Sequence, residues 1–443
     1  PQWAANKVVY QIFPSRFAAT QPVDKKLWYK APITPMDDLH GNLRGIIEHL
    51  DDMKDLGIDV VYLTPIFRSN SCHKYDTIDY YQVDPSFGTT EDLKELVQKS
   101  HERGMKVVLD AVYNHTGRDF FAFQDILEKG EKSKYLDWYF IDELPPKGEW
   151  GEIPNFKCFG YYGGMPKLNL KNPEVEKYIT DVACYWIKEC DIDGWRMDVG
   201  DEISHFFWKN FRRAIKAVKK DMLIIGEIWH YAGDFLEGDE WDTVMNYPFY
   251  LNLIDLLADE KIQVSQFVQN LGYLKGRLNK KCYPLMWNLI DSHDTARFLH
   301  LCKDNKKKQH LAAAFQLLLP GMPMIYYGDE YAMPGANDPD CRRGMYWDEE
   351  YQDKEMYQWY KKLMQIRKTH ACIVEGEMIE IIANDDENTI VMIRKNGEET
   401  IAMLFNCGSS VKEFHAYAQK YNLLTDSAFD GKVDGFDAAV IVL

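Results

Sequence analysis

Apolar segments of strand length alternate with amphipathic segments of helical spacing, and this alternation restricts the possible folds more than any other feature. Eight segments predict strands: 8–14, 60–65, 106–112, 194–199, 222–229, 243–247, 285–292 and 324–329. Strands separated by helices lie parallel, so eight such units predict a closed (β/α)8 TIM barrel of class α/β. A doubly wound open sheet is the alternative, but no Gly-rich phosphate motif follows the first strand.

Two stretches interrupt the alternation. Residues 116–168, rich in Gly, Pro and aromatic residues, are too long for a loop and predict a small inserted domain after the third strand. From residue 372 onward, short alternating segments predict a C-terminal antiparallel β-sandwich. We therefore expect a barrel over 1–115 and 169–371, an insert over 116–168, and a β domain over 372–443.

Composition excludes several classes of partner. A net charge of −17 disfavours nucleic acid and anionic membranes. The longest apolar run, 311–327, is broken by Pro320, Gly321 and Pro323, so it predicts a helix, a turn and a strand rather than a membrane span. Nine cysteines with no CxxC pair favour a reducing compartment. We expect a cytoplasmic protein, or a secreted one if a leader has been removed.

Polar residues gather where the predicted strands end. Those residues are Asp110, Asn114 and His115 after the third strand, Arg196 and Asp198 in the fourth, Glu227 in the fifth, and His293 and Asp294 after the seventh. In a barrel of this kind the active site forms at the carboxyl ends of the strands. Singly, each residue could be a helix cap, a loop residue or half of a buried ion pair. Together they predict an active site.

Several carboxylates without a metal cluster suit glycoside hydrolysis, in which one carboxylate attacks and one carboxylic acid protonates. In the segment GWRMDV (194–199), Arg196 and Asp198 lie two apart and share one face of a strand. We expect Arg196 to lower the pKa of Asp198 and keep it ionised. Glu227, on the adjacent strand, fits the acid, although spacing alone leaves the three acids interchangeable.

Four ordered motifs carry a resemblance to a known family: DAVYNH (110–115), GWRMD (194–198), GEIW (226–229) and DSHD (291–294). With them the whole chain resembles the α-amylase superfamily of retaining α-glucan enzymes. The resemblance implies that Asp198 is the nucleophile, Glu227 the acid/base and Asp294 the third carboxylate. It also implies that further residues orient the nucleophile and hold the reacting sugar: Arg196, His115, His293 and Tyr75 of HKYDT (73–77).

A narrower resemblance rests on MPKLN (165–169), which is similar to the neopullulanase, cyclomaltodextrinase and maltogenic amylase branch. It implies that Asp338 and Arg342 hold the next sugar on the non-reducing side. It also implies that Trp229 forms a wall on the leaving-group side. A loop salt bridge and core packing are the respective alternatives.

The chain departs from the branch in three places. It starts almost at the first strand, without the N-terminal domain that completes a partner's site, so we expect a monomer rather than a domain-swapped dimer. DVGDE (198–202) stands where the branch often has DVANE. The Asn/Asp-rich calcium loop often seen after the first strand in the family is reduced to PSRFAATQPVDKK (14–26). Asn114 aligns with a calcium ligand of other amylases, but we predict neither a metal nor a cofactor.

The predicted function is hydrolysis of α-1,4 bonds in maltooligosaccharides, cyclodextrins and related α-glucans, with pullulan cleavage and some transglycosylation. One alternative is an α-1,6- or exo-acting α-glucosidase of the same superfamily. Another is a non-catalytic glucan-binding or transporter-associated member. Such members lose the carboxylates and carry a membrane segment, whereas all three carboxylates are present here.

Overall fold

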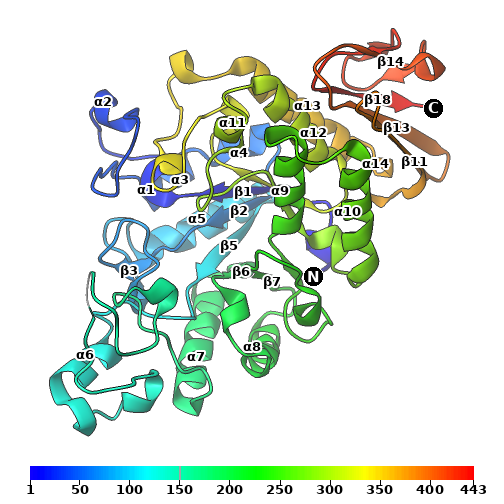
Figure 1. Ribbon diagram of the computed structural model, residues 1–443. Coiled ribbons are helices and arrows are strands. Elements are labelled where there is room, and N and C mark those ends of the chain that lie inside the picture. Colours follow the sequence, from blue (N-terminus) through cyan, green and yellow to red (C-terminus); the bar gives the residue numbers. More distant parts are fainter. Residues whose placement is uncertain (149–150) are drawn as a thin grey trace.

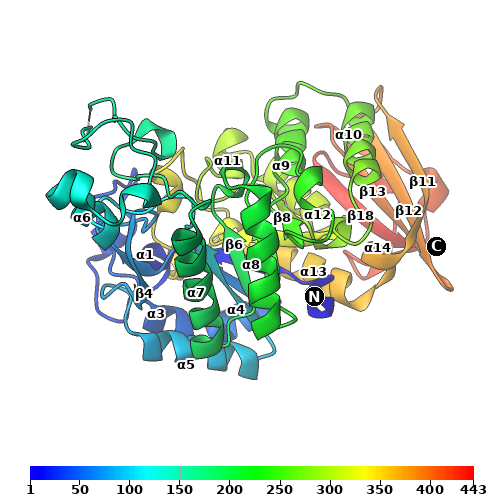
Figure 2. The ribbon, with the colours of Figure 1, turned by 90° about the horizontal axis from the view of Figure 1, so that it is seen from below.

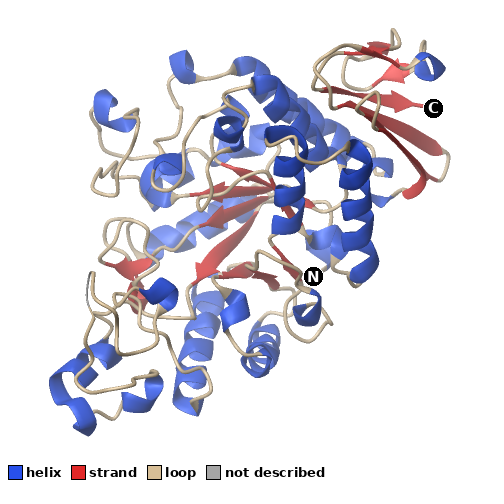
Figure 3. Cartoon of the chain, in the orientation of Figure 1, coloured by secondary structure: helices blue, strands red, loops and turns tan. Residues whose placement is uncertain are grey.

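The computed structural model describes residues 1–148 and 151–443; Glu149 and Trp150 of the predicted insert lie outside the described residues. Eight parallel strands form one sheet in the order β8-β7-β6-β5-β2-β1-β10-β9, and a parallel bridge between Met245 and Trp287 joins its two edges. The barrel predicted from the sequence is therefore confirmed (Figures 1 and 3). Its strands are β1 (Val9–Ile12), β2 (Val60–Leu63), β5 (Lys106–Ala111), β6 (Gly194–Met197), β7 (Leu223–Gly226), β8 (Thr243–Val244), β9 (Trp287–Leu289) and β10 (Met322–Tyr326).

Helices surround the strands, and Figure 2 shows α7 and α8 side by side outside them. The longer helices are α5 (Thr90–Glu102), α7 (Pro173–Cys190), α8 (His205–Val218), α10 (Val264–Arg277), α12 (Lys306–Leu318) and α13 (Lys354–Thr369). The shorter ones include α1 (Pro14–Phe17), α2 (Lys25–Trp28), α6 (Phe121–Lys129), α9 (Tyr247–Leu253), α11 (Phe298–Leu301) and α14 (Cys372–Glu375). No described helix is long and apolar enough to cross a membrane.

Local signals explain where some elements begin and break. Asn172 caps α7 through the Glu174 N–H, with Pro at the first helical position, as its sequence predicts. The predicted strand 243–247 is shorter because Asn246 already caps α9. The segment 41–57, whose apolar residues have helical spacing, forms two helices rather than one: α3 (Leu43–Glu48) and α4 (Leu50–Leu56) are separated by His49, whose ring stacks on Trp347 at 3.6 Å.

The alternation of side chains along each strand creates two separate cores. One lies inside the barrel and includes Val9, Val60, Tyr62, Val108, Leu223, Ile225, Met245, Trp287, Leu289 and Met324. The other lies between strands and helices, and Trp195 and Met197 of β6 belong to it. Since Arg196 alternates with these two, its side chain is on the inner face. A fully buried arginine thus occupies the inner position that pairs with Ile225 on β7 and with Asp110 on β5.

The segment after β5 carries α6 and then largely irregular chain, pinned by isolated bridges such as Ile141–Phe156 and Cys158–Pro166. It lies beside a short hairpin that the sequence analysis did not anticipate, β3 (Phe67–Ser69) with β4 (Thr77–Val83). The Gly117 N–H donates to the carbonyl of Thr77 at 2.7 Å and links the two.

The predicted C-terminal antiparallel β structure is also present, at the upper right of Figure 1. Its six-stranded sheet consists of β11 (Glu377–Asn384), β12 (Thr389–Asn396), β13 (Glu399–Asn406), β18 (Asp437–Val442), β15 (Tyr421–Asn422) and β16 (Ser427–Ala428). A second, two-stranded sheet pairs β14 (Lys412–Glu413) with β17 (Lys432–Val433). Phe405 of β13 stacks on Phe315 of α12 with ring centroids 4.3 Å apart, so the sheet packs on a barrel helix. The exact domain limits stay a prediction.

Asp193 generates a stability prediction because it is buried directly before β6, at the amino end of the barrel. Burial alone would raise its pKa. Hydrogen bonds from His101 at 2.6 Å and from the Val107 N–H, with the charge of Lys219, instead lower that pKa to about 2. A depressed carboxyl pKa stabilises the fold above pH about 4, and the effect is lost as the pH falls toward 2.

We therefore expect Asp193→Asn to lower the free energy of unfolding at pH 7 by about 2 kcal/mol. Urea denaturation at pH 7 and at lower pH measures this, and the deficit should shrink in acid. The control is Asp191→Asn, two residues earlier on the exposed side, which should leave the midpoint nearly unchanged. Equal stability of the two variants would contradict this account.

Candidate active site

The carboxyl ends of the barrel strands surround a cavity of roughly 410 Å³. Eight of the ten predicted site residues line it: Tyr75, His115, Asp198, Glu227, Trp229, Asp294, Asp338 and Arg342. The other two, Arg196 and His293, are completely buried and hold the lining residues from behind. The structure therefore brings all ten predicted residues into one place.

The guanidinium of Arg196 is the electrostatic centre of this site. Its Nη1 donates to Asp110 Oδ1 at 3.0 Å and to Asp198 Oδ1 at 2.8 Å. Its Nη2 lies 2.9 Å from Glu227 Oε2 in an ion pair without hydrogen-bond alignment, and 4.0 Å from Asp294 Oδ2. One cation thus contacts carboxylates at the carboxyl ends of three neighbouring strands and in the loop after a fourth.

The expected effect of Arg196 on its neighbours requires a correction. Burial raises the pKa of Asp198 well above its usual range, and the charge of Arg196 only opposes that rise. Burial likewise raises the pKa of Asp110 to about 6 against the same opposing charge. Arg196 acts in the predicted direction, but the low-polarity interior and the neighbouring carboxylates outweigh it. Because several carboxyl groups share one cation, a proton remains among them.

The backbone after Asp198 is strained in a way that joins β6 to β7. Val199 adopts the left-handed conformation at φ 46°, which is unfavourable for a β-branched residue. This conformation directs its N–H to Glu227 Oε2 at 2.9 Å. Gly200 and Gly226 allow the close approach, because a Cβ at either position would lie within 2.6 Å of the Trp241 ring.

Trp229 contacts Glu227 directly as well. Its Nε1 donates to Glu227 Oε1 at 3.1 Å, and its ring stacks on Tyr247 with centroids 4.0 Å apart. The ring is 42% exposed, so core packing does not explain its position. It forms a wall of the cavity, as the resemblance implied.

Tyr75 and His293 form a stacked pair on another wall, with centroids 5.6 Å apart and planes at 3°. The Tyr75 hydroxyl contacts His293 Nε2 and donates to Asp110 Oδ2 at 3.1 Å. His293 Nδ1 meets the Gln11 amide at 2.8 Å. Burial, with the charges of Arg342 and Arg196, lowers the pKa of His293 far below neutrality. This imidazole is therefore neutral.

The remaining predicted residues complete the rim. His115 Nε2 lies 3.1 Å from the Tyr75 carbonyl, and burial lowers the pKa of His115 to about 4. Arg342 Nη1 pairs with Asp338 Oδ1 at 2.8 Å, while its Nη2 lies 3.4 Å from Asp294 Oδ1. Asp338 and Arg342 thus form a salt bridge and line the cavity at the same time.

Several residues that line or support the cavity were not among those predicted: His73, Phe159, Met165, Val199 and Gln11. Of these, Gln11 had a usable signal, because it is a polar residue inside an apolar strand. Asp110 was predicted at the site as a strand-end residue, and the structure gives it a role as a partner of Arg196. Phe159 and Met165 come from the irregular insert, where no periodicity indicates which side chains face the barrel.

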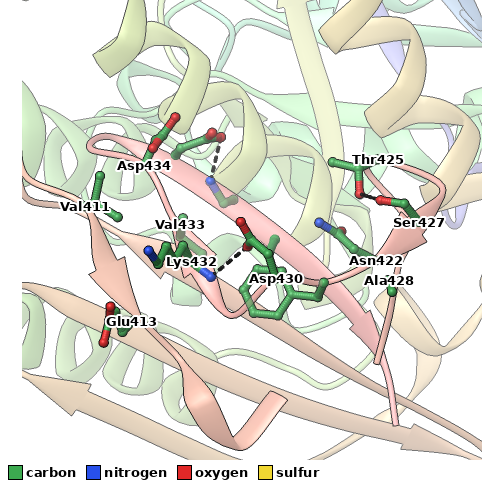
Figure 4. Close-up of a pocket in the computed structure, with 14 residues that line it drawn as sticks. Val411, Glu413, Asn422, Thr425, Ser427, Ala428, Asp430, Lys432, Val433 and Asp434 are labelled. Atoms are coloured by element: carbon green, nitrogen blue, oxygen red, sulfur yellow. Dashed lines mark hydrogen bonds between the residues drawn. The ribbon is translucent and has the colours of Figure 1, made fainter. Parts of the chain in front are cut away.

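A second hollow of roughly 750 Å³ lies in the C-terminal β structure (Figure 4). Asp430 accepts a hydrogen bond from the Lys432 N–H at 2.9 Å there, and Thr425 meets Ser427 at 2.9 Å. Both hydrogen bonds join residues two apart in the chain, so they satisfy polar groups of the local turns rather than mark a ligand site. Its lining aromatic residue, Phe429, is buried and offers no exposed face to a sugar. The site at the barrel mouth therefore remains the candidate.

Comparison with known proteins identifies the group to which this site belongs. Residues 11–376 match the family described as α-amylase, catalytic domain. The chain belongs to the α-amylase family. It is accordingly a glycoside hydrolase, and the predicted resemblance is confirmed.

Relatives and solved structures place the chain within this family. A cyclomaltodextrinase of Geobacillus thermopakistaniensis is 45% identical over 417 residues, covering 93% of this chain and 71% of the relative. One of Thermoanaerobacter pseudethanolicus is 48% identical over 388 residues, covering 86% and 67%. A cyclic α-maltosyl-(1→6)-maltose hydrolase of Arthrobacter globiformis superposes with a TM-score of 0.91 at 34% identity, covering 100% of this chain and 99% of that one.

Removing the central cation should destabilise this amylase-family protein. We expect Arg196→Met to lower the free energy of unfolding at pH 7 by about 3–5 kcal/mol, because buried carboxylates lose their counter-charge. Since the pKa of Asp110 is about 6 with Arg196 opposing its rise, loss of the cation raises that pKa further, and the deficit of the variant grows as the pH rises above about 6. The deficit should therefore be smaller at pH 5 than at pH 7.

Chemical denaturation at both pH values measures this difference. Arg103→Met is a suitable control, because Arg103 pairs with the exposed Asp51 at the surface and should cost at most about 1 kcal/mol. If both variants lose the same stability, Arg196 is not the central counter-charge.

Proposed function

We propose that this protein hydrolyses α-1,4-glucosidic bonds of maltooligosaccharides and cyclodextrins with retention of anomeric configuration. The supporting observation is the Arg196 guanidinium, which holds Asp198 and Glu227 on adjacent nitrogens. Retaining enzymes need their two carboxyl groups only about 5–5.5 Å apart, and a shared guanidinium keeps them close.

We assign the two reacting groups from their contacts with Arg196. Asp198 receives an aligned, charge-assisted hydrogen bond at 2.8 Å, which favours the anion, so it is the nucleophile. Glu227 lacks that alignment with Arg196, and we assign it the acid because its motif GEIW (226–229) matches the acid/base of the family. Glu227 gives its proton to the glycosidic oxygen while an Asp198 oxygen attacks the anomeric carbon, and the bond to the leaving sugar breaks. Glu227, now a carboxylate, then takes a proton from the water that cleaves the glycosyl–Asp198 ester.

The remaining residues receive binding roles. The carboxylate of Asp294 hydrogen-bonds hydroxyls of the reacting sugar, and the ring of Tyr75 stacks beneath it. The neutral imidazoles of His115 and His293 hold Tyr75 in place, through its carbonyl and its hydroxyl respectively. Asp338 and Arg342 hold the next sugar on the non-reducing side. Trp229 contacts the leaving group while its N–H orients Glu227. Aromatic faces with converging polar groups are the usual composition of such a site.

Substitution of the two reacting groups tests this assignment. We expect Asp198→Asn to abolish turnover of maltotriose, and Glu227→Gln to lower kcat by about 10²–10⁴-fold because proton transfer is lost. Chromatography of the products measures both. Asp181→Asn, a surface substitution on α7, should retain full activity. Normal turnover by Asp198→Asn would overturn its role as nucleophile, and inactivity of all three variants would point to misfolding.

Relatives support a choice of substrates. Two of them are named cyclomaltodextrinase, and a structural neighbour of the same length hydrolyses a cyclic tetrasaccharide with α-1,6 links. Cyclodextrins are therefore the leading substrates, with pullulan cleavage and some transglycosylation as additional activities. Hydrolysis of cyclic α-maltosyl-(1→6)-maltose is the second candidate, because that neighbour matches this chain along its whole length.

Initial rates on β-cyclodextrin, soluble starch, pullulan and cyclic α-maltosyl-(1→6)-maltose discriminate these possibilities. We expect β-cyclodextrin to be preferred over starch, with panose released from pullulan. A marked preference for the cyclic tetrasaccharide would support the second candidate. Starch preferred with β-cyclodextrin untouched would contradict both, and MPKLN would then be no guide to the substrate.

We also propose a cytoplasmic location and a monomeric state. All nine cysteines are free within the described residues, as a reducing compartment allows. Light scattering of the purified protein tests the monomer directly.

A further inference from the structure

A second charged cluster lies next to the catalytic cavity and consists of Lys167, Asn114 and Glu202. The Lys167 ammonium donates to Asn114 Oδ1, to Glu202 Oε2 at 3.0 Å and to the Glu202 carbonyl at 3.2 Å. Asn114 Nδ2 in turn donates to Glu202 Oε2 at 3.0 Å. Asn114 is fully buried, and the Lys167 side chain is 22% exposed. One cation is thus surrounded by three oxygen atoms.

These three residues come from three segments that build the catalytic cavity. Lys167 ends the insert, and backbone bonds from the Leu168 N–H to Asn114 and from the Thr116 N–H to Pro166 fix it beside β5. Asn114 immediately precedes His115, whose ring lines the cavity. Glu202 ends the 3-10 helix Gly200–Glu202, which follows the strained residue after Asp198. The ammonium is therefore the charged link among the three.

The oxygen set resembles a site for a hard metal ion, but the residues present do not fit one. Calcium takes 6–8 oxygen ligands at 2.3–2.6 Å. Here three oxygens converge, and the Lys167 nitrogen already occupies the position within reach of all three. A divalent cation at that point would clash with the ammonium group and would be repelled by its positive charge. Asn114, which aligns with a calcium ligand elsewhere in the family, binds a lysine in this chain.

We propose that the Lys167 ammonium serves as a built-in cation that positions His115 and the Asp198 loop, in the place where related enzymes use calcium. The proposal rests on the hydrolase function proposed above. It makes Lys167 a positioning residue, because its ammonium contacts Asn114 and Glu202 rather than the catalytic carboxylates. It also predicts that this site works without calcium.

The same charge has an electrostatic effect on the cavity. His115 is buried, and after burial itself the positive charge of Lys167 also lowers its pKa, to about 4. His115 is therefore neutral at pH 7. Its one N–H donates to the Tyr75 carbonyl, so the imidazole holds Tyr75 without adding charge beside Arg196.

Three substitutions at one position test the proposal. Lys167→Met removes the charge, Lys167→Arg keeps it, and Lys167→Asp replaces it with a carboxylate that completes an oxygen site. The thermal unfolding midpoint Tm is measured in EDTA and in millimolar calcium chloride. The kcat and KM for β-cyclodextrin are measured under the same two conditions.

We expect wild type to give the same Tm and kcat in EDTA and in calcium. Lys167→Met should lose kcat by about 10- to 100-fold, with a smaller change in KM and no response to calcium, because the loop after Asp198 loses its position. Lys167→Arg should retain most of the activity. Lys167→Asp should show a calcium-dependent rise in Tm and a partial recovery of kcat. Lys171→Met, on the same loop, should behave as wild type.

Two results would overturn the proposal: full kcat in Lys167→Met, or an equal calcium response of Tm in wild type and Lys167→Asp. The Tm measurements need no catalysis. They therefore test whether the Lys167 ammonium takes the place of calcium even if the wild-type protein hydrolyses none of the glucans. Such inactivity would instead overturn the proposed function. If Lys167→Met does not fold, the comparison of wild type with Lys167→Asp still decides the question.

Discussion

The structure of the active site depends on a single buried guanidinium. Arg196 occupies an inner position of the barrel and meets Asp110, Asp198 and Glu227, which come from β5, β6 and β7. An arginine alone in such a place would be unfavourable, as would each carboxylate. Together they compensate one another in part, because three ionised carboxylates would carry two more negative charges than the single cation balances. That excess keeps a proton in the site, which is what acid catalysis requires.

The two ends of β6 have different roles: the residue before its amino end stabilises the barrel, and the residue after its carboxyl end belongs to the active site. At its amino end, Asp193 is surrounded by donors and holds the bottom of the barrel together. At its carboxyl end, Asp198 is crowded by other carboxylates and followed by the strained Val199. The aromatic rings of the outer core support this strained turn from below, with Trp241 packed against Gly200 and Gly226. Packing energy therefore maintains an arrangement that is locally unfavourable.

Much of this could be predicted from the sequence because the relevant signals are local. The strand–helix alternation predicted the barrel. Polar residues at the strand ends indicated the candidate carboxylates and Arg196. Long-range contacts could not be predicted in the same way. The helix break lies at His49, whose ring stacks on Trp347, nearly 300 positions away. The roles of Phe159 and Met165 depend on an insert that has little regular structure.

By itself the sequence determined which residues face the barrel interior and which face the helices, since alternation along a strand is a local property. It also determined the family, through four short motifs. Only the tertiary structure decided how the charges are balanced. Burial and the neighbouring carboxylates raise the pKa of Asp198 against the opposing charge of Arg196. In the same way, folding of the insert brought Lys167 to Asn114 and Glu202, because the free energy of a charge depends on what surrounds it in space.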